Sequence, residues 1–260
     1  MDEKSVAKDF PIICVGGSAG GLDAYTRLLQ NLPSDMGVAI VIVNHLRTVA
    51  TLLHKILPNY TKMPVELITE RLDIQPNHVF IIPEKRDLHI LNDEFRLKPI
   101  SKPRGWPDVI TVFLRSLTKN WDGKLIAVIV SGYDGDGAEA LCGIKEVGGI
   151  TIAQKPGTAA QPDMPESAIE SGCIDFILSP EDIAKEIKRI ANPGKKKNRI
   201  CSIITGQLFQ NVPTPARGPG LTQTKLLAAT AAKQLFLHTF IYSRFKFLEW
   251  IRTVLKIAKA

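Results

Sequence analysis

A serine, a histidine and two aspartates follow three β-rich apolar runs of this chain, and together they could perform acyl transfer. Ser18 lies in the glycine-rich stretch VGGSAGG, and His45 follows the apolar run VAIVIV. Asp134 and Asp136 lie in SGYDGDGA, after the run LIAVIV. A serine nucleophile needs a histidine base, and that histidine needs a carboxylate to orient it. The residue types therefore predict a hydrolytic serine centre.

The glycine-rich stretch around Ser18 has a competing interpretation as a nucleotide site. In a dinucleotide-binding turn, G-x-G-x-x-G brings a glycine against the pyrophosphate, and an acid follows the second strand. Here Ser18 replaces the middle glycine, and Asn44 and His45 follow the second run. G-x-S-x-G over residues 16–20 instead fits a strand-to-helix turn that exposes a nucleophile. Without further evidence, a serine between glycines more often belongs to a tight turn that caps a helix than acts as a nucleophile.

The remaining histidines do not follow a predicted buried strand, and we expect surface or structural roles for them. They are His54, His78, His89 and His238. The identity of the orienting carboxylate stays open at this point. Asp136 could instead cap the helix that it precedes, and Asp134 could be a turn residue.

The elements that must position these residues alternate between strand and helix patterns. The alternation predicts an α/β fold, with a doubly wound, mostly parallel sheet, helices on both faces and a small β-hairpin. Polar residues at the carboxyl ends of parallel strands then meet at one edge of the sheet. The predicted strands are 12–15, 38–43, 79–83, 125–130, 150–153 and 174–178; the helices are 22–32, 51–60, 109–119, 136–147, 165–171 and one capped by Ser179; the hairpin is 87–98, turning at Asn92 and Asp93.

The formal net charge of +7 is distributed unevenly along the 260 residues. Residues 1–192 hold 21 lysines and arginines and 25 acidic residues, whereas residues 193–260 hold 12 and a single acid, Glu249. The excess of basic residues lies in 193–260, so it does not indicate that residues 1–192 bind nucleic acid. We expect a catalytic domain over 1–192, a basic Pro/Gly-rich linker over 193–220 and a basic helix-compatible tail over 221–260. The tail could contact an anionic surface or an acidic partner, or it could be a loosely docked remnant of a larger fusion.

The four cysteines indicate the cellular compartment. Cys14, Cys142, Cys173 and Cys201 form no C-x-x-C pair, so we expect reduced thiols in a cytoplasmic protein and no metal site. The first ten residues are mixed in charge and do not read as a secretory signal. No run reaches the roughly 20 apolar residues of a membrane span.

With Ser18 in VGGSAGG, His45 in VNHL and Asp136 in SGYDGDGA, the chain resembles the catalytic domain of bacterial chemotaxis protein-glutamate methylesterases (CheB type). The resemblance extends over about residues 10–191 and includes PNHVFIIPEKRDLHIL and DMPESAIESG. The stretches TKMPVELI and PRG resemble those family members whose methylesterase domain is fused to a methyltransferase module.

The resemblance implies hydrolysis of γ-glutamyl methyl esters on methylated chemoreceptors, in some members also deamidation of glutamine, and no metal or organic cofactor. Family members usually have a glycine where this chain has Asp134. The alternative is therefore a receptor-binding or signalling module with the same fold and impaired catalysis. The implied site consists of Ser18 as nucleophile, His45 as base, Asp136 as orienting acid, the N–H of Tyr133 at the oxyanion, and Ala19 and Asp134 in the active-site loops.

Overall fold

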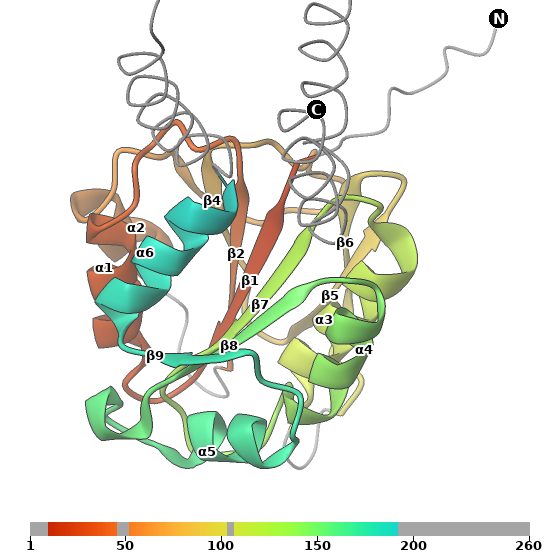
Figure 1. Cartoon of the computed structure of the whole chain (residues 1–260). Helices are drawn as coiled ribbons and strands as arrows, with labels where there is room; N and C mark the ends of the chain where they lie inside the picture. The colour runs from red at the N-terminus through yellow and green to blue at the C-terminus, as the bar shows by residue number, and fades with distance from the viewer. Residues whose placement is uncertain (1–9, 46–51, 103–106, 192–260) are drawn as a thin grey trace, which may run out of the picture. The chain divides into compact units, whose positions relative to one another are not determined.

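A parallel sheet of seven strands organises the part of the chain that the computed structural model describes, which is residues 10–45, 52–102 and 107–191 (Figure 1). The strand order is β3-β4-β2-β1-β7-β8-β9. Every neighbouring pair is parallel, so the predicted α/β class is confirmed. The strands are β1 (Ile12–Gly17), β2 (Ala39–Asn44), β3 (Val65–Leu67), β4 (His78–Ile81), β7 (Leu125–Ile129), β8 (Ile150–Gln154) and β9 (Phe176–Leu178).

The central strands β1, β2 and β7 are buried on both faces because their sequences are continuously apolar. Every residue of β1 and of β7 is buried, as are the first five of β2. Such runs are typical of parallel strands covered by helices on either side. β1 pairs with β2 up to Gly17 and Asn44, so both strands end at the same level of the sheet.

Helices cover both faces of the sheet (Figure 1). Their apolar residues recur every three or four positions, as Ile183, Ala184, Ile187 and Ile190 do, and this stripe faces the strands. One face carries α1 (Gly21–Gln30), α2 (Leu53–Ile56) and α6 (Pro180–Ala191), and the other carries α3 (Val109–Asn120), α4 (Leu141–Glu146), α5 (Asp163–Glu170) and the hairpin β5 (Arg86–Leu91) and β6 (Glu94–Pro99).

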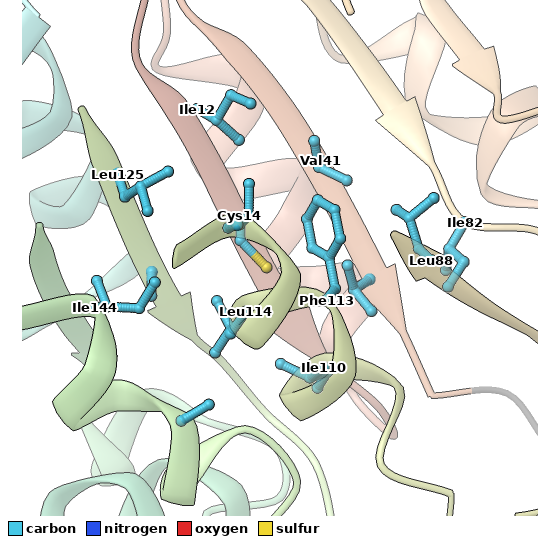
Figure 2. Packing of buried hydrophobic residues seen from close by; sticks show 14 of the residues in the cluster. Ile12, Cys14, Val41, Ile82, Leu88, Ile110, Phe113, Leu114, Leu125 and Ile144 are labelled. Atoms are coloured by element: carbon cyan, nitrogen blue, oxygen red, sulfur yellow. The ribbon is translucent and has the colours of Figure 1, made fainter. Parts of the chain in front are cut away.

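Helix α3 packs directly over the centre of the sheet (Figure 2). Phe113 and Leu114 of this helix lie in one buried cluster with Cys14 of β1 and Val41 of β2. Burial, helped by the charge of Asp136, raises the pKa of the Cys14 thiol, so this cysteine is a core residue rather than a nucleophile. The position of α3 is therefore fixed by the core, close to the carboxyl ends of β1 and β7.

The predicted hairpin turn at Asn92 and Asp93 is confirmed. Both residues have positive φ angles, 53° and 59°, as a two-residue type I′ turn requires. The hairpin packs on α3, where the N–H of Ile90 donates to Oγ of Ser116 at 2.9 Å.

Three elements differ from the prediction by more than the position of their ends. The helix expected from residue 136 begins later, with a 3-10 turn at Ala138–Ala140 before α4, because Gly137 has a left-handed φ of 93°. The helix expected over 51–60 consists of α2 and a 3-10 turn at Leu57–Asn59, since a proline interrupts it. Strand β3 was not predicted, because its three residues at the sheet edge are only half-buried.

The expectation of reduced thiols is wrong for two cysteines. Cys142 of α4 and Cys173, which follows α5, form a disulfide with their Cα atoms 5.1 Å apart. They are 31 positions apart in the sequence, so only the packing of α4 beside the segment after α5 brings them together.

The predicted linker over 193–220 and the tail over 221–260 lie outside the described residues. In the described ranges, no helix has the length and apolar character required to cross a membrane. The predicted cap of the last helix is confirmed, because Oγ of Ser179 accepts the N–H of Asp182 at 3.3 Å.

Candidate active site

The predicted site residues follow three adjacent strands at the point where the strand order reverses. On one side of β1 lie β2, β4 and β3, and on the other side lie the later strands β7, β8 and β9. In open α/β sheets, ligands bind at such a switch point, beyond the carboxyl ends of the strands. Ser18 follows β1, His45 follows β2, and Asp134 and Asp136 follow β7.

Glycines bring the chain sharply from β1 through Ser18 into α1. Gly20 adopts a left-handed φ of 75°, and a Cβ on Gly17 would lie 2.5 Å from the hydroxyl oxygen of Tyr25. The N–H of Ser18 donates to the carbonyl of Ser131 at 2.9 Å, which ties the turn to the end of β7. The hydroxyl of Ser18 donates to the backbone carbonyl of His45 at 3.2 Å.

A buried polar network that the sequence did not reveal supports this turn. Oγ of Ser131 donates to the carbonyl of Ala19 at 2.8 Å and accepts the N–H of Gln161 at 2.9 Å. The N–H of Ser131 donates to Oε1 of the buried Gln154 at 3.0 Å. A glutamine at the end of an apolar strand was the available signal, because a buried amide must find partners.

His45 lies against the acid loop, which we define as residues 132–137. Its side chain is 2% exposed, and its Nδ1 lies 2.8 Å from Oδ2 of Asp134. Burial lowers the pKa of His45, but the hydrogen bond and charge of Asp134, aided by Asp136 and the Pro107 carbonyl, outweigh burial and raise it. The protonated imidazole is therefore stabilised where it would form during acid–base catalysis.

Asp134 is held in place by its own loop. Its Oδ1 accepts the N–H of Asp136 at 3.0 Å, which directs Oδ2 towards His45. Such a local bond from an aspartate to the amide two residues on restricts the carboxylate.

Asp136 binds the start of α3. Its Oδ2 accepts the N–H of Ile110 and its Oδ1 accepts the N–H of Thr111, both at 2.9 Å. The N–H of Gly137 donates to Oγ1 of Thr111 at 2.8 Å. Burial raises the pKa of Asp136, although the two amides of α3 oppose the shift. The predicted cap is therefore found on α3 rather than on the helix that follows Asp136.

The acid loop also lies beside the serine. A Cβ on Gly132 would be 3.0 Å from Cβ of Ser18. The side chain of Tyr133 is exposed. Over the described ranges, the N–H groups of Ala19 and Tyr133 donate to no acceptor. Both amides are therefore available for hydrogen bonding to a substrate.

Two of the other described histidines, His78 and His89, have surroundings that do not include Ser18 or the acid loop. Nδ1 of His78 lies 3.0 Å from the carbonyl of Pro76, and Nε2 lies 3.4 Å from a carboxylate oxygen of Glu66. His89 is on the hairpin, and its pKa is lowered mainly by burial. In the part of the chain that the structure describes, no three histidine, cysteine, aspartate or glutamate side chains form a group suited to a metal ion.

Comparison with known proteins identifies the family of this domain. Residues 13–187 match the family model described as CheB methylesterase. The chain belongs to the CheB methylesterase family. The predicted family and the predicted class of enzyme, a carboxylic-ester hydrolase of chemotaxis, are thereby confirmed.

Relatives of the CheB methylesterase domain share about a third of its sequence. A protein from Leptospira interrogans is 33% identical over 184 residues, which are 70% of this chain and 95% of the relative. Protein-glutamate methylesterase/protein-glutamine glutaminase 4 from Burkholderia thailandensis is 31% identical over 192 residues, 73% of this chain and 56% of the relative.

A solved structure has the same fold. The CheB methylesterase catalytic domain from Thermotoga maritima superposes with a TM-score of 0.62 at 25% identity. The match spans 69% of this chain and 97% of that domain.

Proposed function

We propose that this CheB-family domain hydrolyses γ-glutamyl methyl esters of methylated chemoreceptors through Ser18 and His45. One observation carries the proposal: in a domain of this family, a serine turn, a histidine and a carboxylate loop from three strands meet at the sheet's switch point. The buried contact between His45 and Asp134 supports a histidine that alternates between base and acid.

The proposed reaction has two steps. Oγ of Ser18 bonds to the ester carbonyl carbon while its proton moves to His45, and methanol then leaves with that proton. A water molecule gives a proton to His45 and attacks the acyl carbon, which releases glutamate and restores Ser18. In the free protein the Ser18 hydroxyl bonds the His45 carbonyl, so rotation about its Cα–Cβ bond must direct it to the imidazole.

The N–H groups of Ala19 and Tyr133 are the proposed donors to the oxyanion. Ala19 directly follows the nucleophile, and Tyr133 belongs to the acid loop beside Ser18. Two amides in a preorganised loop stabilise the negative charge that develops on the carbonyl oxygen. Each such donor contributes on the order of 10²–10³ in turnover.

Glutamine deamidation is a second proposed reaction at the same serine. The Burkholderia relative carries both activities in its name. An amide would follow the same two steps with ammonia, rather than methanol, as the leaving group. The proposed partner is in both cases a receptor that carries a glutamyl ester or a glutamine.

The variant Ser18→Ala tests the proposed function. We expect methanol release from methylated receptor to fall by on the order of 10⁴–10⁶, because the nucleophile is lost. The fold should remain intact by circular dichroism. The variant Ser101→Ala, at an exposed serine of the hairpin's far end, is the matched control and should retain full activity.

A serine-reactive phosphonate separates catalysis from pure binding. An activated hydroxyl at Ser18 should become labelled in the native chain and not in Ser18→Ala. Absence of labelling in a native chain that releases no methanol would favour the receptor-binding module instead.

We also propose that the protein works in the cytoplasm, and its membership of the CheB methylesterase family supports this location. Cell fractionation followed by detection of the full chain tests the proposal. Recovery of the chain outside the cytoplasmic fraction would contradict it.

A further inference from the structure

The acid loop contains two carboxylates, and we infer that Asp134, rather than Asp136, positions the His45 imidazole for catalysis. This inference rests on the proposed function, since it assigns the third member of that site. Asp136 has a different task, which is to hold the acid loop on the first turn of α3.

Contact and preorganisation both favour Asp134. Its Oδ2 lies 2.8 Å from Nδ1 of His45, and its Oδ1 is fixed by the N–H of Asp136. The side chain of Asp134 is 18% exposed and that of His45 is 2% exposed, so water screens their attraction only weakly. A short, partly buried and locally restrained contact is what an orienting carboxylate needs.

The carboxylate of Asp136 is already engaged on both oxygens. The amides of Ile110 and Thr111 bind it at 2.9 Å each, at the positive end of the α3 dipole. Each oxygen could accept a second bond, but the two amides hold the Asp136 carboxylate at α3. The recorded carboxylate contact of Nδ1 of His45 is with Oδ2 of Asp134, at 2.8 Å.

The contact with Asp134 determines which nitrogen of His45 is basic. A carboxylate only accepts hydrogen bonds, so it holds the imidazole proton on Nδ1 and leaves Nε2 as the base. An asparagine could instead present its N–H₂ group to Nδ1 and move the proton to Nε2. In serine hydrolases, the wrong tautomer costs on the order of 10⁴ in turnover.

Imidazole NMR of the full chain tests the assignment directly. Nitrogen-15 spectra give the tautomer and the titration of His45, which is assigned from its missing signal in His45→Gln. We expect Nδ1–H in the native chain, and a shift towards Nε2–H with a lower pKa in Asp134→Asn. Asp136→Asn, at a temperature where it is folded, should retain Nδ1–H.

The pH dependence of methanol release gives a second readout. Among the described residues, the charged groups that act on His45 are Asp134 and Asp136, and both raise its pKa. Since His45 must be neutral to act as a base, losing Asp134 should move the acidic limb of kcat/KM to lower pH. At the optimum, kcat/KM should fall on the order of 10⁴-fold. Asp136→Asn should move this limb less.

A second variant keeps the test decisive. Asp134→Gly removes the carboxylate without adding an amide, and it should also lower the pKa of His45. If neither variant at 134 alters the tautomer or titration of His45, while Asp136→Asn alters both, the inference is overturned. Because NMR does not require turnover, this result is independent of whether Ser18→Ala abolishes methanol release.

Discussion

At the residue scale, the absence of a side chain at Gly132 allows the acid loop to approach the serine. A Cβ there would lie 1.9 Å from Sδ of Met164 and 3.0 Å from Cβ of Ser18. The N–H of Gly132 also donates to the carbonyl of Gln161 at 3.0 Å, and its carbonyl accepts the N–H of Met164. The loop is therefore pressed between the serine turn and α5.

Replacing Gly132 by alanine should disturb both stability and catalysis. The added methyl group must displace Met164 or the loop, and overpacking of this kind costs about 1–3 kcal/mol in the free energy of unfolding. Because the loop carries Asp134, methanol release should fall as well. Urea unfolding and the esterase assay measure the two effects separately.

The matched control is Gly157→Ala, because a Cβ on Gly157 meets no atom within 4 Å. This variant should unfold at the urea concentration of the native chain and keep its activity. If both alanine variants lost stability and activity equally, the close packing of Gly132 against Met164 and Ser18 would not explain the loss.

At the element scale, Asp136 connects the end of β7 to the beginning of α3. The acid loop thereby caps a helix that is 25 residues earlier in the sequence, and Thr111 returns a bond to Gly137. Phe113 and Leu114 anchor α3 in the core. Because the acid loop is hydrogen-bonded to α3, its position is fixed by this helix. The geometry of the proposed site therefore depends on a helix that supplies none of its proposed catalytic side chains.

Loss of this carboxylate should destabilise the fold. Asp136→Asn removes a buried charge from the positive end of α3 and weakens one of two hydrogen bonds, so we expect a loss of about 1–3 kcal/mol. Thermal unfolding followed by circular dichroism measures the change.

The comparison for Asp136→Asn is Asp23→Asn in the first turn of α1. The Asp23 side chain is 61% exposed and contacts Arg27 on the surface, where an ion pair contributes little. A loss at Asp23 as large as that at Asp136 would contradict the capping role that we assign to Asp136.

At the scale of the whole domain, the disulfide joins two connections in one half of the sheet. Cys142 belongs to the connection between β7 and β8, and Cys173 to the connection between β8 and β9. The bond closes a loop with a sequence separation of 31 residues, which restricts the unfolded chain. It lies away from Ser18 and His45 in the sequence, so we expect it to affect stability more than chemistry.

Reduction should lower the stability of the purified protein by about 2–4 kcal/mol. Urea unfolding with and without dithiothreitol measures the difference in the oxidised chain. The double variant Cys142→Ser/Cys173→Ser should be insensitive to the reductant. If dithiothreitol lowered the stability of this variant by the same amount, the loss of stability could not be attributed to the disulfide.

The sequence alone determined most of the elements and the alternation of strands and helices, although it did not reveal β3. Short, continuously apolar and β-branched runs such as VAIVIV indicate buried strands. The positive φ angles at Asn92 and Asp93 were predictable because these residues tolerate them. The motifs around Ser18, His45 and Asp136 were enough to predict the family that residues 13–187 confirm. This information is local, so it can be read along the chain.

Only the tertiary structure decided which side chains meet. Asp134 and Asp136 are two positions apart and chemically identical, and which one contacts His45 depends on where α3 presents its free amides. The pairing of Cys142 with Cys173 likewise depends on how two connections pack. The physical reason is the same in both cases, because a contact between distant segments depends on the geometry of the packed sheet and helices, which no local pattern records.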